Sequence, residues 1–308
     1  MDVFVWSLPI VSGLADGLYR GAIKISQVHR FLLLAGSYLF ALPFYLPLLV
    51  AEGVPVIKPA FWLVLAAHVP LLLIAQILTV EAHRISPLAL TAPYLSLTTV
   101  WLLVTSPLMR SGTPSFLGGG GVIAVTLGLY FLNIREGQQS LLDPFRQLRR
   151  ERGSVLMLIV SLIFAITANL DYLAFKNANA SFYLVVDHGI VGVICGLLAL
   201  GYWSFGRIAE KELKPYRWWS LPLCGFVIAA SVVPHMLAFW WIPFVPYVIA
   251  GKRAGVVFFS VAIGIAISLM PRFGGRYVEE RANLNWRLPG VALIIVGMLM
   301  IIFWGKTI

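Results

Sequence analysis

The sequence predicts an all-α integral membrane protein whose ten transmembrane helices form two inverted five-helix repeats. The chain of 308 residues is 60% hydrophobic and only 12% charged, with a mean hydropathy of +0.89, whereas soluble domains carry about 25% charged residues. Its apolar residues gather in ten long runs. Short motifs of the first five runs recur in the same order in the last five.

Each apolar run is close to the length that a membrane crossing needs, which is roughly 17–25 residues of helix for about 30 Å of hydrocarbon. The runs are continuously apolar rather than alternating, and this pattern favours helices over a β-barrel. The ten expected spans are residues 3–22, 30–50, 60–82, 86–108, 117–134, 154–175, 182–205, 218–239, 245–270 and 288–305.

Most basic residues lie in or beside the loops between the runs, and their distribution bears on orientation. Counted together with the adjoining ends of the spans, the loops after odd-numbered spans hold 17 of the 23 Lys and Arg residues, and the even loops and the C-terminus hold the other 6. Cytoplasmic loops are enriched in Lys and Arg, so the count predicts that the odd loops are cytoplasmic and that both termini face outward. Because the net charge of +10 is spread in this way, we expect no nucleic-acid partner.

The sequence shows neither a signal peptide nor a cysteine motif. The N-terminal stretch MDVFVWSLPIVSG has no basic n-region and no small-residue cleavage site, so no cleaved signal peptide is expected. Cys195 and Cys224 lie in separate runs without metal-ligand spacing, and we expect them to be buried thiols.

An internal repeat divides the chain. LYRGAIK (18–24) matches LDYLAFK (170–176), the pair Pro-Tyr recurs at 93–94 and 246–247, and GVIAVTLG (121–128) matches GVALIIVG (290–297). We therefore expect a first repeat in residues 1–134, a central basic loop in 135–153 and a second repeat in 154–308. Because five spans are an odd number, the second repeat must enter the membrane from the opposite side, as in many secondary transporters.

Four segments carry a resemblance to a known family: ISPLALTAPYLSLTTVWLLVTSPL (85–108), GGGGVIAVTLGLYFLN (118–133), AGKRAGVVFFSVAIGIAISL (250–269) and EERANLNWRLPGVALIIVGMLMI (279–301). In them the chain resembles the EamA-type transporters of the drug/metabolite transporter superfamily. The resemblance implies an exporter of amino acids or other small metabolites in a bacterial cytoplasmic (inner) membrane, with relatives that carry sugar nucleotides or phosphates. It also implies cytoplasmic termini, against the charge count.

Asp171 is the first candidate for a functional residue, because a carboxylate inside hydrocarbon is costly. It lies in TANLDYLAFK (167–176), near the end of the sixth run, with Asn169 and Tyr172 as neighbouring hydrogen-bonding groups. One interpretation is an interfacial pair of Asp171 with Lys176. The other is a carboxylate facing a hydrated cavity, where it binds a cationic group or a coupling proton.

Histidines supply further candidates. Asp187 and His188, about six residues inside the seventh run, form either a proton-sensing pair or a helix-start hydrogen-bond arrangement. His68 lies near the centre of the third run, and His235 lies in the eighth beside an aromatic cluster. Each must face protein or a water-filled cavity, so each is either a cavity residue or an interhelical hydrogen-bonding group.

Three other features complete the set of candidates. Lys252 and Arg253, near the start of the ninth run, form either a positive anchor or an anion site, and the resemblance favours a substrate contact for Lys252. Trp101 in the fourth run is a further candidate substrate contact. Asp16 and Arg20 lie one turn apart and are expected to pair with each other.

We therefore expect a secondary-active transporter, and not an enzyme, that exports a small polar metabolite such as an amino acid by alternating access. The alternatives are a flippase for lipid or lipid-linked substrates and a sugar-nucleotide or phosphate carrier of the same superfamily. A membrane enzyme acting on pyrophosphate substrates would need clustered acids, and the 13 acidic residues are spread out. No cofactor or metal is expected; the partners are the substrate, a coupling proton and the bilayer, and the chain acts as a monomer or homodimer.

Overall fold

The computed structural model describes residues 3–26, 28–86, 94–109, 112–132, 152–208, 218–268 and 284–305. Most of the predicted central loop 135–153 lies outside these residues, as does most of the second long loop, 272–287. Arg152 and Gly153 already belong to a helix, which therefore begins two residues before the predicted start of the second repeat.

The described residues form α-helices joined by turns and short loops, with no strand among them. In chain order the helices are α1 (Val3–Ser26), α2 (Arg30–Leu39), α3 (Leu42–Glu52), α4 (Ala60–Ile85), α6 (Thr98–Leu108), α7 (Phe116–Leu132), α9 (Arg152–Asn177), α10 (Ala180–Ser204), α11 (Ser220–Ala238), α12 (Val245–Ser268) and α14 (Leu284–Trp304). Because α2 and α3 make one continuous apolar segment and count as one helix, the described part of the chain has ten helices, the number that the sequence predicts.

Five described spans are long and apolar enough to cross a membrane. They are Arg30–Glu52, Ala60–Ile85, Arg152–Asn177, Ala180–Ser204 and Ser220–Ala238. Shorter apolar helices cover Tyr94–Leu108, Phe116–Phe131 and Pro289–Trp304. The outer face of α10 exposes Val193, Leu197 and Leu200, which would be unfavourable in water and suits contact with lipid tails.

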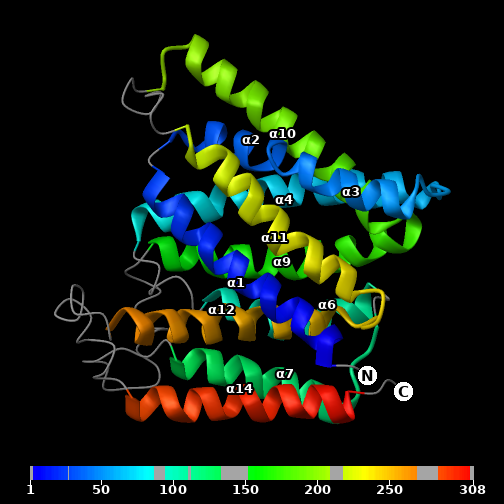
Figure 1. Cartoon of the computed structure of the whole chain (residues 1–308), viewed down its shortest axis with the longest axis vertical. Coiled ribbons are helices and arrows are strands. Elements are labelled where there is room, and N and C mark those ends of the chain that lie inside the picture. Colours follow the sequence, from blue (N-terminus) through cyan, green and yellow to red (C-terminus); the bar gives the residue numbers. More distant parts are fainter. Residues whose placement is uncertain are drawn as a thin grey trace.

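Successive spans run back and forth across the molecule, so that the first turn of α1 and the last turn of α14 lie at the same edge (Figure 1). The pair α7 and α14 packs at one end of the array, and α2 packs against α10 at the other. Between them, α4 packs against α9, and α1 packs against both α11 and α12. This central group of helices encloses the site described below.

Glycines allow the central helices to approach closely. A Cβ atom added to Gly13 of α1 would overlap the carbonyl oxygen of Lys252 in α12, and one added to Gly255 would overlap the carbonyl oxygen of Ile10. Small residues at crossings let helix backbones meet inside a membrane. The α1–α12 crossing therefore brings Lys252 and Arg253 next to the polar face of α1.

Candidate substrate cavity

A cavity of about 130 Å³ lies among the central helices. Its walls come from both the predicted repeats, with α1, α2, α4 and α6 from the first and α9 to α12 from the second. Drug-sized ligands occupy pockets of roughly 300–1,000 Å³. In this conformation the cavity therefore has room for a small solute or a few water molecules.

One wall of the cavity is acidic, and His68 is at its centre. The imidazole Nε2 atom lies 3.0 Å from Asp171 Oδ1, and Nδ1 lies 2.9 Å from Asp187 Oδ1. The Tyr183 hydroxyl donates a hydrogen bond of 2.5 Å to the same Asp171 oxygen. His68 and Asp187 are almost completely buried, and Asp171 is partly open to the cavity. Helix α4 is thereby linked to both α9 and α10.

The positions of these residues along their helices explain why they meet. Asp171 is six residues before the end of α9, Asp187 is seven after the start of α10, and His68 is eight after the start of α4. At 1.5 Å per residue, each lies about 9–12 Å in from the same edge of the array. The short connection between α9 and α10, at Ala178 and Asn179, keeps the two carboxylates at the same depth.

A second wall of the cavity, formed by residues of α1, α11 and α12, is basic. Asp16 Oδ2 accepts hydrogen bonds from Arg20 Nη2 and from Arg253 Nη1, each at 3.0 Å. Lys252 lies 3.5 Å from His235 Nδ1, and no carboxylate among the described side chains forms an ion pair with it. The Nε atom of Arg253 is buried without a hydrogen-bond partner in the described residues. Among the described side chains, this wall therefore holds three cations and one carboxylate, and the carboxylate bonds two of the three.

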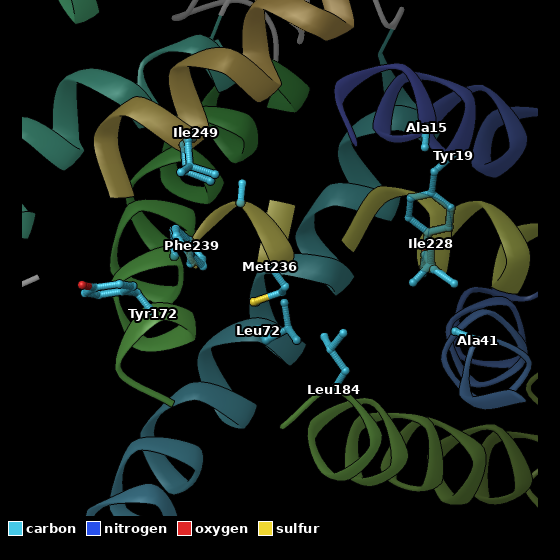
Figure 2. Packing of buried hydrophobic residues seen from close by; sticks show 14 of the residues in the cluster. Ala15, Tyr19, Ala41, Leu72, Tyr172, Leu184, Ile228, Met236, Phe239 and Ile249 are labelled. Atoms are coloured by element: carbon cyan, nitrogen blue, oxygen red, sulfur yellow. The ribbon is translucent and has the colours of Figure 1, made fainter. Parts of the chain in front are cut away.

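Apolar side chains complete the lining. Figure 2 shows Leu72 of α4, Leu184 of α10 and Met236 of α11 close together, in the same region as Ile228 and Ile249. All five line the cavity. The site thus combines an acidic wall, a basic wall and an apolar surface, which is an arrangement suited to a small molecule with two opposite charges and a short apolar part.

Six of the nine candidate residues line this cavity: His68, Asp171, Asp187, His188, His235 and Lys252. His188 is bonded through Nδ1 to the hydroxyl of Tyr45 at 2.7 Å, and its ring packs edge-on against Tyr38. His235 Nδ1 lies 3.1 Å from the carbonyl oxygen of Ser231, one turn earlier in α11.

The other three candidates point elsewhere. Asn169 donates to Thr105 and accepts from Ser106, both in α6. Tyr172 packs against Phe239, and Trp101 Nε1 donates to Ser161 Oγ. These residues join helices to each other and are absent from the lining of the cavity.

The two alternative interpretations of Asp171 can now be compared with the structure. Asp171 bonds His68 and Tyr183, whereas the ammonium group of Lys176 lies over the ring of Tyr172, 4.6 Å from its centre. The described side chains contain no Asp171–Lys176 ion pair, so the interfacial pairing is wrong. The pairing of Asp16 with Arg20 is confirmed.

Two features of the cavity were not predicted from the sequence: the contribution of Tyr183 and the bond of Arg253 to Asp16. Tyr183 lies four residues before Asp187, a spacing that places both side chains on one helix face, so this signal was available. The Asp16–Arg253 contact joins residues 237 positions apart, and no local pattern indicates it. In the described residues no group of His, Cys, Asp and Glu is arranged to hold a metal ion.

The fold and the cavity together indicate a multi-pass α-helical membrane protein. A crystal structure described only as that of a protein aligns with 97% of this chain and 99% of its own, with a TM-score of 0.64 and 13% sequence identity. At that identity the likeness establishes the fold alone. No family model and no curated protein matches the sequence.

Proposed function

We propose that the protein is a secondary-active transporter that exports a small polar metabolite, and that its substrate is a zwitterion such as an amino acid. The observation that carries the proposal is the buried cavity with Asp171 and Asp187 on one wall and Lys252 and Arg253 on the other. Charged groups at membrane depth are costly and mark solute pathways. A substrate with both charges can pair an ammonium group with the acidic wall and a carboxylate with the basic wall.

The pairing of helices supports an inverted repeat. In chain order α1, α2–α3, α4, α6 and α7 correspond to α9, α10, α11, α12 and α14. Exchanging each helix for its counterpart converts the α4–α9 contact into α11–α1 and the α6–α9 contact into α12–α1, and both are present. The α2–α10 and α7–α14 contacts convert into themselves. This pattern fits two halves related by a two-fold axis, with the substrate site between them.

The cavity size supports a substrate no larger than an amino acid. Its apolar part, formed by Leu72, Leu184 and Met236, would accept a short side chain. In the proposed cycle the helices of one half rock against the other, so that the cavity opens to one side of the membrane and then to the other.

A carrier of anions such as phosphate is the second candidate. It is favoured by Lys252, which lacks a carboxylate partner among the described side chains, and by the unsatisfied Arg253 Nε atom. However, an anion would leave Asp171 and Asp187 facing a like charge, which is unfavourable. The zwitterion is therefore our first proposal.

Counterflow in proteoliposomes tests the function. Vesicles containing the purified chain would be loaded with unlabelled glycine, L-alanine, L-serine or inorganic phosphate and diluted into the same labelled compound. We expect transient accumulation of at least one amino acid and none of phosphate. Accumulation of phosphate alone would favour the second candidate. The flippase would be favoured if none of these compounds exchanged and if added dithionite quenched a fluorescent phospholipid that starts in the inner leaflet of the vesicles.

A further inference from the structure

We infer that His68 is the proton-carrying residue that couples transport to a pH gradient, and that it exchanges its proton for the ammonium group of the substrate. This inference rests on the proposed function. It follows from the position of the imidazole, whose two nitrogen atoms each face a carboxylate of the other half: Asp171 in α9 at 3.0 Å and Asp187 in α10 at 2.9 Å.

Hydrogen-bond chemistry ties this arrangement to the proton. An imidazolium has two N–H donors and can bond both carboxylates at once, whereas neutral imidazole has one donor and one acceptor. When His68 gives up a proton, one of its nitrogens presents a lone pair to a carboxylate. That link between α4 and the second half then changes from attractive to repulsive. Protonated His68 thus donates to both carboxylates, whereas neutral His68 donates to only one of them. The Tyr183 hydroxyl of α10 lies 3.2 and 3.3 Å from the Nδ1 and Nε2 atoms of His68 in the same cluster.

The net charge of the acidic wall changes when His68 loses its proton. Two carboxylates and an imidazolium sum to one negative charge, and loss of the proton leaves two. An ammonium group that arrives beside Asp171 restores the original sum. In the exchange the N–H bond of His68 breaks, its electron pair stays on nitrogen, and the proton passes to water in the cavity on the side from which the substrate enters. One proton is therefore released for each substrate bound, and the substrate and proton cross in opposite directions.

Two other cavity histidines are less suited to this role. His188 bonds the Tyr45 hydroxyl, and His235 lies between the Ser231 carbonyl and the Lys252 ammonium group. Neither has a carboxylate within hydrogen-bond distance among the described side chains. The titratable and charged groups that face the same cavity as His68 are Asp16, Tyr19 and Arg20 from α1, Tyr38 from α2, Asp171 from α9, Tyr183, Asp187 and His188 from α10, His235 from α11, and Lys252 and Arg253 from α12.

The neighbouring groups favour His68 as the point of exchange. Arg20 and Arg253 both bond Asp16 of the basic wall, so they leave Asp171 and Asp187 to the imidazole. The Tyr183 hydroxyl bonds the same Asp171 oxygen that faces His68. Because Asp171 is more open than His68 or Asp187, we assign the contact with the ammonium group to Asp171.

The test compares two transport modes in the same proteoliposomes, with the labelled amino acid that gives wild-type counterflow as the probe. Counterflow at equal pH on both sides needs no coupling. Accumulation of the probe in vesicles with an acidic lumen and a neutral exterior does need coupling, because the protons that leave the vesicle drive the probe inward. Because His68 lines the substrate cavity, we expect His68→Gln to lower counterflow but to keep it measurable, and to lose accumulation driven by the pH gradient completely. His29→Gln is the matched control, because His29 packs against Phe31 and Tyr202, outside the cavity.

A second variant, His68→Arg, keeps a fixed positive charge with several donors between the carboxylates. We expect its transport to lose the response to the gradient. Gradient-driven accumulation in either variant at the wild-type level would overturn the inference, as would accumulation in wild type that requires an alkaline lumen. Loss of counterflow in both variants while His29→Gln retains it would also overturn it, because His68 would then act in binding or folding. Absence of counterflow in wild type would instead remove the proposed function itself.

Discussion

At the scale of single residues, helix geometry separates the candidates that face the cavity from those that do not. Asp171 and Asn169 belong to the same polar stretch, but two residues correspond to about 200° around a helix. Asp171 therefore faces α4 and the cavity, and Asn169 faces α6. The cost of polar groups in hydrocarbon predicted that these residues need protein or water around them. It did not predict which direction each one takes.

The partners of His68 could not be predicted from the sequence. Asp171 and Asp187 are 103 and 119 positions away, and only the packing of α4 against α9 and α10 brings them together. Polarity within an apolar run gave the candidate residues, and the tertiary structure gave the bonds between them.

The variant Asp171→Asn tests the acidic wall. The amide would keep the shape of the side chain but lose the negative charge that pairs with a substrate ammonium group. Hydrogen bonds to charged groups contribute about 1.5–3 kcal/mol, so we expect counterflow affinity to fall by roughly 10- to 100-fold and gradient-driven accumulation to disappear. Transport unchanged at every pH would refute the role of Asp171. Glu81→Gln is the control, since Glu81 pairs with Arg30 at a partly exposed site and such pairs contribute little.

The variant Lys252→Gln tests the basic wall. The change removes an ammonium group that has only His235 as a hydrogen-bond partner in the described residues, so the fold loses little. We expect weaker binding of a zwitterionic amino acid, measured as a higher concentration for half-maximal counterflow. Binding of the corresponding amine, which lacks the carboxylate, should be unaffected. Equal losses for the amino acid and the amine would contradict the assignment of Lys252 to the carboxylate.

At the scale of helices, most spans were predictable because hydrocarbon thickness fixes their length. The predicted run 60–82 corresponds to Ala60–Ile85, and 182–205 to Ala180–Ser204. The division of the second span was not predicted. It bends at Phe40 and Ala41, just before Pro43, which has no backbone N–H to continue the hydrogen bonds of a helix. The continuously apolar character of the run does not by itself indicate this bend. Residues 87–93 of the predicted fourth span lie outside the part that the structure describes.

The glycine stripe of α1 gives a prediction at this scale. Gly13→Ala would place a methyl group against the backbone of α12, at the carbonyl of Lys252. Among the side chains that the structure describes, Gly17→Ala would meet that of Val256, at an ordinary contact distance of 3.8 Å. Overpacking costs about 1–3 kcal/mol. We expect Gly13→Ala to lower the unfolding temperature in detergent and Gly17→Ala to leave it nearly unchanged. Equal unfolding temperatures for the two variants would mean that the close α1–α12 approach does not limit stability.

At the scale of the whole molecule, composition predicted a multi-pass helical membrane protein, and the internal repeat is the basis for proposing two halves related by a two-fold axis. Three short matches between the halves led to the expectation of a two-fold arrangement, and the helix contacts fit it. The substrate could not be predicted in the same way. Substrate recognition depends on six or more side chains from helices spread over the whole chain, and no local sequence motif encodes the relative positions of these side chains.

A cavity between two halves that rock against each other must become accessible from both sides of the membrane. Gln76 of α4 lines the cavity near the middle of its helix, and the native Cys195 and Cys224 are buried. A cysteine at position 76 can therefore be labelled selectively, and the wild-type chain serves as the control.

Labelling of Gln76→Cys by a membrane-impermeant maleimide, in spheroplasts and in inverted vesicles, addresses the carrier mechanism most directly. Alternating access predicts reaction from each side, with protection on both sides by the amino acid that gives counterflow. Reaction from one side only, or from neither, would contradict a transporter that opens its charged cavity to the two compartments in turn.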